Sequence, residues 1–195
     1  MNISRRKFLG GCGLLLGGSS GFISSLLSGS GPVALRPPGA REGKEFLATC
    51  IRCGQCVEAC PYDSLKLFGL GGGLAMGTPH VEARKVPCYL CTNEDELKCI
   101  GACPSGALEP VEDRSKVRMG TAVINHKTCF AFNGVTCRVC WRVCPFQGTA
   151  LVYDKRMRPT IDPKACVGCG ICEEACITEK SSIVVRPANS NEGVG

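Results

Sequence analysis

The chain has 195 residues, and its 17 cysteines, 25 glycines, 12 prolines and 6% aromatic content exclude a large conventional hydrophobic core. So much cysteine in a short chain indicates a disulfide scaffold or a metal protein, and the lack of any run of 18 uninterrupted apolar residues excludes a polytopic membrane protein. The formal charge of +6 counts every cysteine as neutral, and there is no basic stripe with interleaved aromatic residues, so we expect no nucleic-acid partner.

The first thirty residues have the pattern of an export signal. The segment Arg5-Arg6-Lys7-Phe8-Leu9, followed by a weakly apolar Gly/Ser/Leu-rich stretch to about Ser30, resembles a twin-arginine signal. That route carries folded proteins, which suits a protein that acquires a metal cofactor in the cytoplasm. We therefore expect the twin-arginine translocase as a partner and a periplasmic location, either peripheral on the outer face of the cytoplasmic membrane or anchored by an uncleaved signal. The alternative is a basic N-terminus with a Gly/Ser leader.

The sixteen other cysteines form four motifs about 40 residues apart. Motifs one and four have the regular spacing C-x2-C-x2-C-x3-C, while motifs two and three each contain one gap of seven residues. In chain order the motifs consist of Cys50, Cys53, Cys56 and Cys60; Cys88, Cys91, Cys99 and Cys103; Cys129, Cys137, Cys140 and Cys144; and Cys166, Cys169, Cys172 and Cys176. Proline follows the last cysteine of the first three motifs, and Ile177 follows that of the fourth.

The regular spacing is that of bacterial ferredoxins. A tight loop brings three thiolates to one [4Fe-4S] cluster, and the fourth cysteine, three residues on, faces a second cluster. Zinc knuckles use pairs of C-x2-C separated by a longer loop and need neither the triple nor the proline. A disulfide scaffold suits an exported protein, but cysteines so close together bridge poorly, and the export signal implies folding before the oxidising compartment. We therefore predict four [4Fe-4S] clusters held by all sixteen cysteines.

Two motifs make a two-cluster module by exchanging their fourth cysteines. Because motifs one and four are alike in spacing, as are motifs two and three, we predict nested pairs, as in the four-cluster ferredoxin subunits that this chain resembles. The four clusters then have these ligands: Cys50, Cys53, Cys56 and Cys176; Cys166, Cys169, Cys172 and Cys60; Cys88, Cys91, Cys99 and Cys144; and Cys129, Cys137, Cys140 and Cys103. The alternative pairs motifs that are neighbours in sequence, one with two and three with four.

The predicted elements are few and short. Four helices carry the fourth cysteines, over Gln55–Cys60, Cys99–Cys103, Val139–Cys144 and Ile171–Cys176. Val, Ile, Thr and Tyr between turn residues predict strands at Leu65–Phe68, Val81–Val86, Thr121–Asn125, Ala150–Tyr153, Thr160–Asp162 and Ile183–Arg186.

The predicted fold is a loop-rich α+β fold of two ferredoxin-like bis-[4Fe-4S] modules, one inserted within the other. Its parts are a signal at 1–30, a linker at 31–43, an outer module at 44–79 plus 159–187, an inserted module at 80–158 and a loose tail at 188–195.

No catalytic constellation is visible in the sequence. His80 and His126 lie far apart without a Ser, Asp or metal partner at a useful spacing, and the run 71–73 of glycines lacks the Lys and Ser/Thr of a phosphate loop. Trp141 and Tyr62 lie beside predicted ligands, where we expect them to shield clusters from water. The clusters themselves are the expected function, so the chain is not an enzyme by itself but an electron-transfer subunit of an oxidoreductase system.

Several segments beyond the general cysteine pattern resemble the NapG/MauM family of ferredoxin-type proteins. They are Leu35–Ala40 (LRPPGA), Cys50–Leu67 (CIRCGQCVEACPYDSLKL), Gly77-Thr78-Pro79 and Arg118-Met119-Gly120. The resemblance implies a periplasmic iron–sulfur subunit of a quinol dehydrogenase system. Such a protein takes electrons from a membrane quinol-oxidising partner of the NapH type and passes them toward periplasmic nitrate reductase or a similar acceptor. MauM-type relatives serve methylamine oxidation instead.

Two other interpretations stay open. An iron–sulfur subunit of a molybdenum oxidoreductase would copurify tightly with a large catalytic chain. A structural zinc-binding interaction module would be colourless and indifferent to dithionite.

Overall fold

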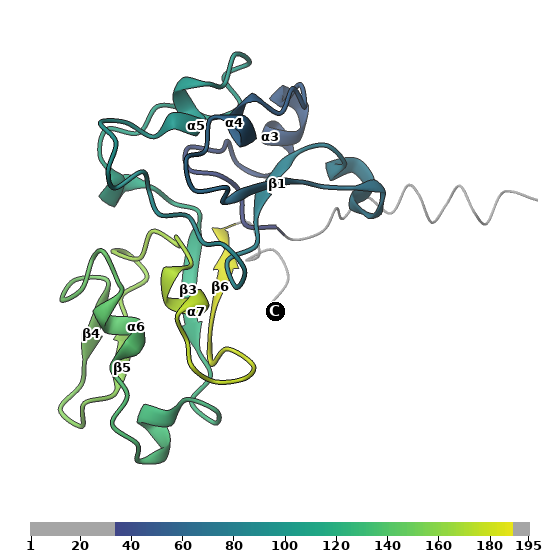
Figure 1. The fold of residues 1–195 in the computed structure, drawn as a ribbon. Coiled ribbons are helices and arrows are strands. Elements are labelled where there is room, and N and C mark those ends of the chain that lie inside the picture. The colour runs from purple at the N-terminus through teal and green to yellow at the C-terminus, as the bar shows by residue number, and fades with distance from the viewer. Residues whose placement is uncertain (1–33, 189–195) are drawn as a thin grey trace, which may run out of the picture.

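The structure, a computed structural model, describes residues 34–188. The predicted export signal and all but the first residue of the predicted tail lie outside these residues. Figure 1 shows the described chain as two loop-rich lobes, lobe one of residues 34–117 and lobe two of residues 118–188. The predicted α+β class with few, short elements is confirmed. No helix in the described part of the chain is long and apolar enough to cross a lipid bilayer.

Four one-turn helices lie where the cysteine motifs predict them. They are α4 (Gln55–Glu58), α5 (Lys98–Gly101), α6 (Val139–Arg142) and α7 (Ile171–Glu174). Each contains the third cysteine of its motif and ends two residues before the fourth, whereas the prediction extends each helix through the fourth. In the first three motifs the following proline disfavours helical backbone at the fourth cysteine. The cysteine pattern does not predict α3 (Gly43–Thr49), which buries Phe46 in lobe one.

Short 3-10 helices complete the helical structure at η1 (Leu70–Ala75), η2 (Arg114–Lys116) and η3 (Phe130–Asn133). The first of them occupies the glycine-rich stretch between two paired strands. Its turn reverses through Gly73, whose φ of 53° lies in the left-handed region that favours glycine. The glycine run is therefore the tip of a hairpin.

The strands pair into three two-stranded antiparallel sheets within the described residues. The pairs are β1 (Leu65–Leu67) with β2 (Pro79–Val81), β3 (Gly120–Ile124) with β6 (Ile183–Pro187), and β4 (Leu151–Tyr153) with β5 (Pro159–Ile161). Five of the six predicted strands are confirmed to within one residue at either end. The strand predicted at Val81–Val86 is wrong, because β2 ends at Val81. The amide of Lys85 donates to the carbonyl of Glu82 at 2.8 Å, which turns the chain there.

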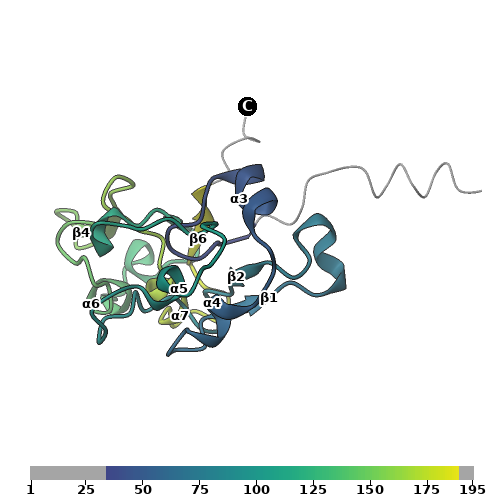
Figure 2. The same ribbon diagram turned by 90° about the horizontal axis from the view of Figure 1, so that it is seen from above.

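The contacts between helices contradict the predicted insertion of one module into the other. Helix α4 of motif one packs on α5 of motif two in lobe one, where Figure 2 also shows α4 beside β1. Helix α6 of motif three packs on α7 of motif four in lobe two. The sheet of β3 and β6 joins the beginning and the end of lobe two. The modules are therefore consecutive along the chain rather than nested.

The two lobes meet through backbone that approaches very closely. A Cβ atom built on Gly170, where φ is +87°, would lie 2.5 Å from the Cβ of Ala83 in lobe one. Arg84 spans the same interface, and its guanidinium donates to the carbonyls of Glu173, Glu174 and Cys176 at 2.7, 2.9 and 2.8 Å. The carbonyls of Glu173 and Glu174 end helix α7, and that of Cys176 lies two residues beyond it, so Arg84 supplies donors that the helix itself cannot.

Candidate iron–sulfur sites

The sixteen predicted cysteines gather into four sets of four thiols. Each set combines three cysteines of one motif with the fourth cysteine of the neighbouring motif. The sets are site I, Cys50, Cys53, Cys56 and Cys103; site II, Cys60, Cys88, Cys91 and Cys99; site III, Cys144, Cys166, Cys169 and Cys172; and site IV, Cys129, Cys137, Cys140 and Cys176. All sixteen are free thiols.

Site I contains the one solvent-exposed cysteine among those that the structure describes. Burial raises the pKa of the Cys56 thiol to about 11, and the thiolates of Cys50, Cys103 and Cys53 raise it further. The pKa of Cys103 is lowered, because hydrogen bonds from the backbone of Leu108 and from its neighbours outweigh the effect of burial. Cys53 is exposed to solvent. Site I therefore presents one of its sulfurs at the surface of lobe one.

Site II lies deep in lobe one. Its four cysteines line a pocket together with Tyr62 and Tyr89. Burial raises the pKa of the Cys88 thiol to about 12, against a hydrogen bond from the backbone of Leu90 that lowers it. The expectation that Tyr62 lies beside a cluster ligand therefore agrees with its position on the wall of this cavity.

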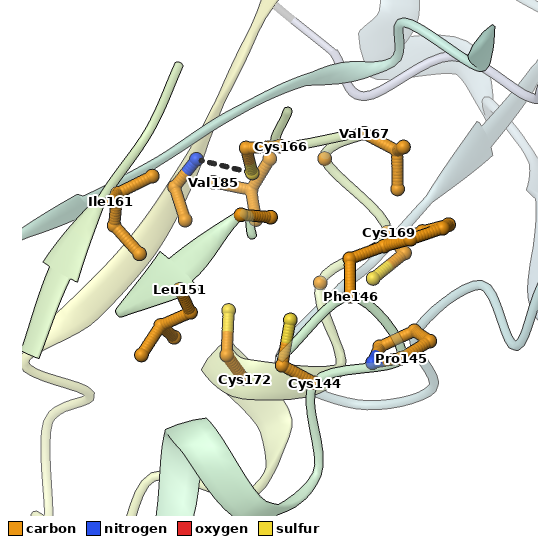
Figure 3. Close-up of a pocket in the computed structure, with 14 residues that line it drawn as sticks. Cys144, Pro145, Phe146, Leu151, Ile161, Cys166, Val167, Cys169, Cys172 and Val185 are labelled. Atoms are coloured by element: carbon orange, nitrogen blue, oxygen red, sulfur yellow. Dashed lines mark hydrogen bonds between the residues drawn. The ribbon is translucent and has the colours of Figure 1, made fainter. Parts of the chain in front are cut away.

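Site III is a pocket lined by its four cysteines and by apolar residues such as Leu151 and Val185. Figure 3 shows the sulfurs of Cys144 and Cys172 pointing into this pocket from one side. Burial raises the pKa of Cys172 well above its ordinary value, and neighbouring thiolates add to the shift. The amide of Ala122 donates to the sulfur of Cys166 at 3.5 Å, the dashed line in Figure 3.

Site IV is a pocket lined by its four cysteines in lobe two. Burial raises the pKa of Cys140 to about 11. Cys176 behaves differently, because hydrogen bonds from the Thr178 hydroxyl and the Ser182 amide outweigh burial and lower its pKa to about 7. The pKa of Tyr153 is raised by burial and then by the Cys140 thiolate, which places its ring beside site IV.

The observed sets correct the predicted nested ligand sets at all four positions where a fourth cysteine is exchanged. Cys103 completes site I and Cys176 completes site IV, while Cys60 and Cys144 complete sites II and III. Only 27 residues separate Cys60 from Cys88, whereas 105 separate Cys60 from Cys166. Exchange between neighbours closes the shorter loops, which costs less chain entropy. The alternative of pairing neighbouring motifs is therefore the one that the structure contains.

The seven-residue gaps of motifs two and three, which suggested the nested pairing, each fold into local structure. In motif two the amide of Glu94 donates to the carbonyl of Cys91 at 2.9 Å, which folds the gap into a turn. In motif three the 3-10 helix η3 fills the corresponding gap. A gap of seven residues thus lengthens the loop around one site and does not decide which motif is the partner.

The four sites form a single row. Burial and nearby thiolates raise the pKa of Cys99 in site II, and Cys56 of site I is among those thiolates. Cys140 of site IV contributes in the same way at Cys172 of site III. Between the lobes, the amide of Cys88 in site II donates to the carbonyl of Cys169 in site III at 2.9 Å. The order is I, II, III, IV, and the row crosses the boundary between the lobes.

The residues at these sites fit [4Fe-4S] clusters. At sites II, III and IV four thiols line one largely apolar pocket, and thiols with raised pKa values gain from a bound cation that favours the thiolate. The hydroxyl oxygen of Tyr153 is buried beside site IV without a hydrogen-bond partner among the described residues. Within those residues no three His, Cys, Asp or Glu side chains are grouped so as to hold a single metal ion.

These pockets, paired by the exchange of fourth cysteines, define a ferredoxin-type iron–sulfur protein. Residues 49–107 match the 4Fe-4S dicluster domain family and residues 159–179 match the 4Fe-4S binding domain family. The first match covers motifs one and two together, as the structure pairs them.

Related proteins identify the family of this chain within the class of ferredoxin-type iron–sulfur proteins. The chain is 42% identical over 173 residues to ferredoxin-type protein NapG of Escherichia coli (strain K12), covering 83% of this chain and 74% of that protein. It is 43% identical over 185 residues to methylamine utilization ferredoxin-type protein MauM of Methylobacillus flagellatus, covering 89% and 78%. The chain belongs to the NapG/MauM family of ferredoxin-type proteins, which are electron carriers with 4Fe-4S domains.

Proposed function

We propose that the protein is a periplasmic electron carrier with four [4Fe-4S] clusters in a row. It takes electrons from a membrane quinol-oxidising protein of the NapH type and passes them toward periplasmic nitrate reductase or a similar acceptor. The observation that carries this proposal is the continuous row of four-thiol sites, which crosses the lobe boundary at Cys88 and Cys169. The family membership supports the role in electron transfer.

When bound, the clusters supply one-electron redox chemistry. The chain's own residues hold and insulate them. Cysteine thiolates bind the iron, and backbone amides such as those of Ala122 and Ser182 donate to thiol sulfurs at 3.5 and 3.4 Å, which stabilises negative charge there. Buried apolar side chains such as Leu151 and Val167 line site III and exclude water.

Site I is the end suited to a membrane partner. Leu70 and Leu74 at the tip of the β1–β2 hairpin are 91% and 62% exposed, and Ile51, beside exposed Cys53, is 62% exposed. Arg52 holds this tip against motif one, because its guanidinium donates to the carbonyls of Met76 and Leu74 at 2.9 and 3.2 Å. An exposed apolar surface next to an exposed ligand is suited to docking and electron entry.

The location of the protein follows from the same proposal. The Arg5-Arg6-Lys7-Phe8-Leu9 segment would direct the folded, cluster-loaded chain to the twin-arginine translocase. In the periplasm the protein would be peripheral on the outer face of the cytoplasmic membrane, or anchored there by an uncleaved signal.

A role in methylamine oxidation is the second candidate. It is favoured by the MauM relatives, whose 38 to 43% identity spans the 40 to 42% identity of the NapG relatives. A subunit of a molybdenum oxidoreductase is the third candidate, and tight copurification with a large catalytic chain would identify it. A protein that is colourless, binds zinc and ignores dithionite would contradict all three.

The test uses the full-length holoprotein, prepared anaerobically, with membranes from the same cells and duroquinol as the electron donor. We expect the visible iron–sulfur absorbance to bleach only when membranes and quinol are both present. Periplasmic extract plus nitrate should then reoxidise the protein. Reoxidation that requires no nitrate, and that instead depends on active methylamine metabolism in the cells, would favour the MauM-like role. Protein that dithionite reduces but that membranes with quinol do not would contradict the proposed donor.

A pair of variants localises electron entry. Leu70→Ser/Leu74→Ser should slow reduction by membranes, because it removes the apolar tip beside site I. Val123→Ser/Val184→Ser is the matched control, since these paired side chains of the β3–β6 sheet are 40% and 46% exposed in lobe two. Equal slowing by both variants would contradict entry at site I.

A further inference from the structure

We propose that the surface around site IV is a docking site for an acidic electron-transfer protein. This inference rests on the proposed function and specifies the partner at the opposite end of the row from site I. The site IV surface is defined here by exposed basic residues around exposed apolar ones. The basic residues are Lys127, Arg138, Arg142, Lys155 and Arg156, and the apolar residues are Phe130, Val135 and Ile177.

Charge is distributed unequally between the lobes. Lobe two has ten Lys and Arg against five Asp and Glu, a formal charge of +5, whereas lobe one has ten against eleven, a charge of −1. Two clusters with their thiolates contribute about −4 to each lobe. Lobe two is then near +1 and lobe one near −5, so the difference between the two ends persists in the loaded protein.

Ring and cation contacts bring the basic residues together around site IV. The Arg138 guanidinium lies 5.9 Å from the ring centre of Tyr153, at the end of β4, and the ring centres of Trp141 and Tyr153 are 5.6 Å apart. These contacts join α6, which carries Cys140, to the β4–β5 turn, which carries Lys155 and Arg156. Figure 1 shows α6, β4 and β5 side by side in lobe two, at the end away from α3 and α4.

The turn is fixed to the same site from its other strand. Arg158 lies 5.1 Å from the ring centre of Phe132 in η3, and it forms an ion pair with Asp154 at 2.7 Å. Pro159, the next residue, lines the site IV cavity with Cys129 and Cys137. Helix α6, η3 and strand β5 therefore line one cavity, and the β4–β5 turn contacts α6 through Arg138 and Tyr153 and η3 through Arg158 and Phe132.

Most of this positive charge is not neutralised within the chain. Arg158 is paired with Asp154, but in the described part of the molecule no acidic side chain forms an ion pair with the five basic residues of the site IV surface. The acidic residues nearest in sequence to site IV are Glu173 and Glu174, three and two residues before Cys176, and Glu179, three residues after it. By contrast, Arg41, Lys85 and Lys98 of lobe one all have carboxylate partners.

The surface also has an apolar centre next to the ligands. Phe130 follows Cys129 and Ile177 follows Cys176, and both line the mouth of the cavity while being 39% and 61% exposed. An apolar centre with a charged rim is the usual arrangement of an interface between proteins. The charge of the rim determines which partner binds, because a partner of opposite charge associates faster and a partner of like charge loses binding free energy. The complementary partner is an acidic protein.

The experiment measures both binding and electron transfer with full-length holoprotein. Plastocyanin, an acidic copper protein, is the probe, and cytochrome c, a basic haem protein, is the mismatched probe. The test variant is Arg142→Gln/Lys155→Gln/Arg156→Gln. The matched control is Lys44→Gln/Lys66→Gln/Lys116→Gln, which removes the same charge from exposed lysines of lobe one that form no ion pair among the described residues. Calorimetry gives the Kd, and stopped-flow mixing of dithionite-reduced protein gives the rate.

At low ionic strength we expect plastocyanin to bind more tightly and to be reduced faster than cytochrome c, with both effects falling as salt is added. The test variant should lower the plastocyanin rate about tenfold and flatten its salt dependence, while the control variant changes the rate less than about twofold. Equal effects of the two variants, or a preference for cytochrome c, would overturn the docking surface.

The experiment distinguishes failure of the electron-carrier function from failure of the docking surface. Reduced protein that gives no electron to plastocyanin, cytochrome c or ferricyanide would refute the electron-carrier function itself. Ready transfer to ferricyanide without any dependence on the test variant would leave the carrier function intact and refute only the docking surface.

Discussion

The hydroxyl of Tyr153 offers a direct test of how the chain adjusts site IV. Its oxygen is buried without a hydrogen-bond partner among the described residues. The pKa of Tyr153 is raised by burial and then by the Cys140 thiolate, so the hydroxyl lies near negative sulfur. We predict that in the loaded protein this hydroxyl donates a hydrogen bond at site IV, and that Tyr153→Phe removes it while keeping the ring that packs on Trp141.

The expected effect is a more negative reduction potential. A hydrogen bond to a charged acceptor contributes ~1.5–3 kcal/mol, and it is stronger when the acceptor is more negative, as in the reduced state. A difference of ~1 kcal/mol between the two redox states corresponds to ~40 mV, because a tenfold change in a one-electron equilibrium is ~59 mV or ~1.4 kcal/mol. Loss of the donor should therefore lower the potential of one cluster by tens of millivolts.

The assay is an EPR-monitored potentiometric titration of the full-length holoprotein. Tyr62→Phe is the matched control, since Tyr62 also lines a thiol cavity but its hydroxyl is not a buried, unpartnered atom. One of the potentials should fall in Tyr153→Phe, and all should stay in place in Tyr62→Phe. Unchanged potentials in Tyr153→Phe, or a rise, would refute the hydrogen bond at site IV.

Two further predictions concern the interface between the lobes. Arg84→Ala removes donors to three carbonyls at the end of α7 and should lower the free energy of unfolding by ~1–3 kcal/mol, measured by urea denaturation of the holoprotein. Lys85→Ala, which loses only a surface ion pair, should cost less than ~1 kcal/mol, and equal losses would count against Arg84 as a link between lobes. Gly170→Ala places a Cβ 2.5 Å from Ala83 at a φ of +87° and should reduce iron content and thermal stability. Gly69→Ala, which meets no atom within 4 Å, should be tolerated, and an unaffected Gly170→Ala would mean that the lobes are not held this closely.

The local structure could be predicted from the sequence because it depends on local chemistry. The x2-x2 spacing forces a loop followed by one helical turn, and strands such as Ile183–Pro187 alternate buried and exposed residues as their β-branched composition indicates. The strand predicted at Val81–Val86 is wrong because the prediction depends only on the composition of residues 82–86. There the Glu82 carbonyl accepts from two amides, those of Lys85 and Val86, and the chain turns.

The partnership between motifs could not be predicted from spacing. All sixteen thiols gather as expected, but which fourth cysteine completes each site depends on packing of α4 on α5 and of α6 on α7. The short connections between neighbouring motifs favour the exchange of fourth cysteines between neighbours. They indicate the pairing better than the similar spacing of motifs one and four does. Tyr153 and Arg84 were missed for a similar reason, because each acts through a partner that is distant in sequence or belongs to another element.

The central claim is that four clusters are held by thiol sets exchanged between neighbouring motifs. Iron and acid-labile sulfide analysis of anaerobically prepared full-length protein tests it in the unmodified chain and two variants. The unmodified chain should contain about 16 iron and 16 sulfide, four of each for every cluster. Cys53→Ala/Cys103→Ala removes two ligands of site I and should leave about 12 iron, whereas Cys53→Ala/Cys176→Ala affects sites I and IV and should leave about 8. The opposite result, about 8 for the first variant and about 12 for the second, would restore the nested arrangement and contradict the account.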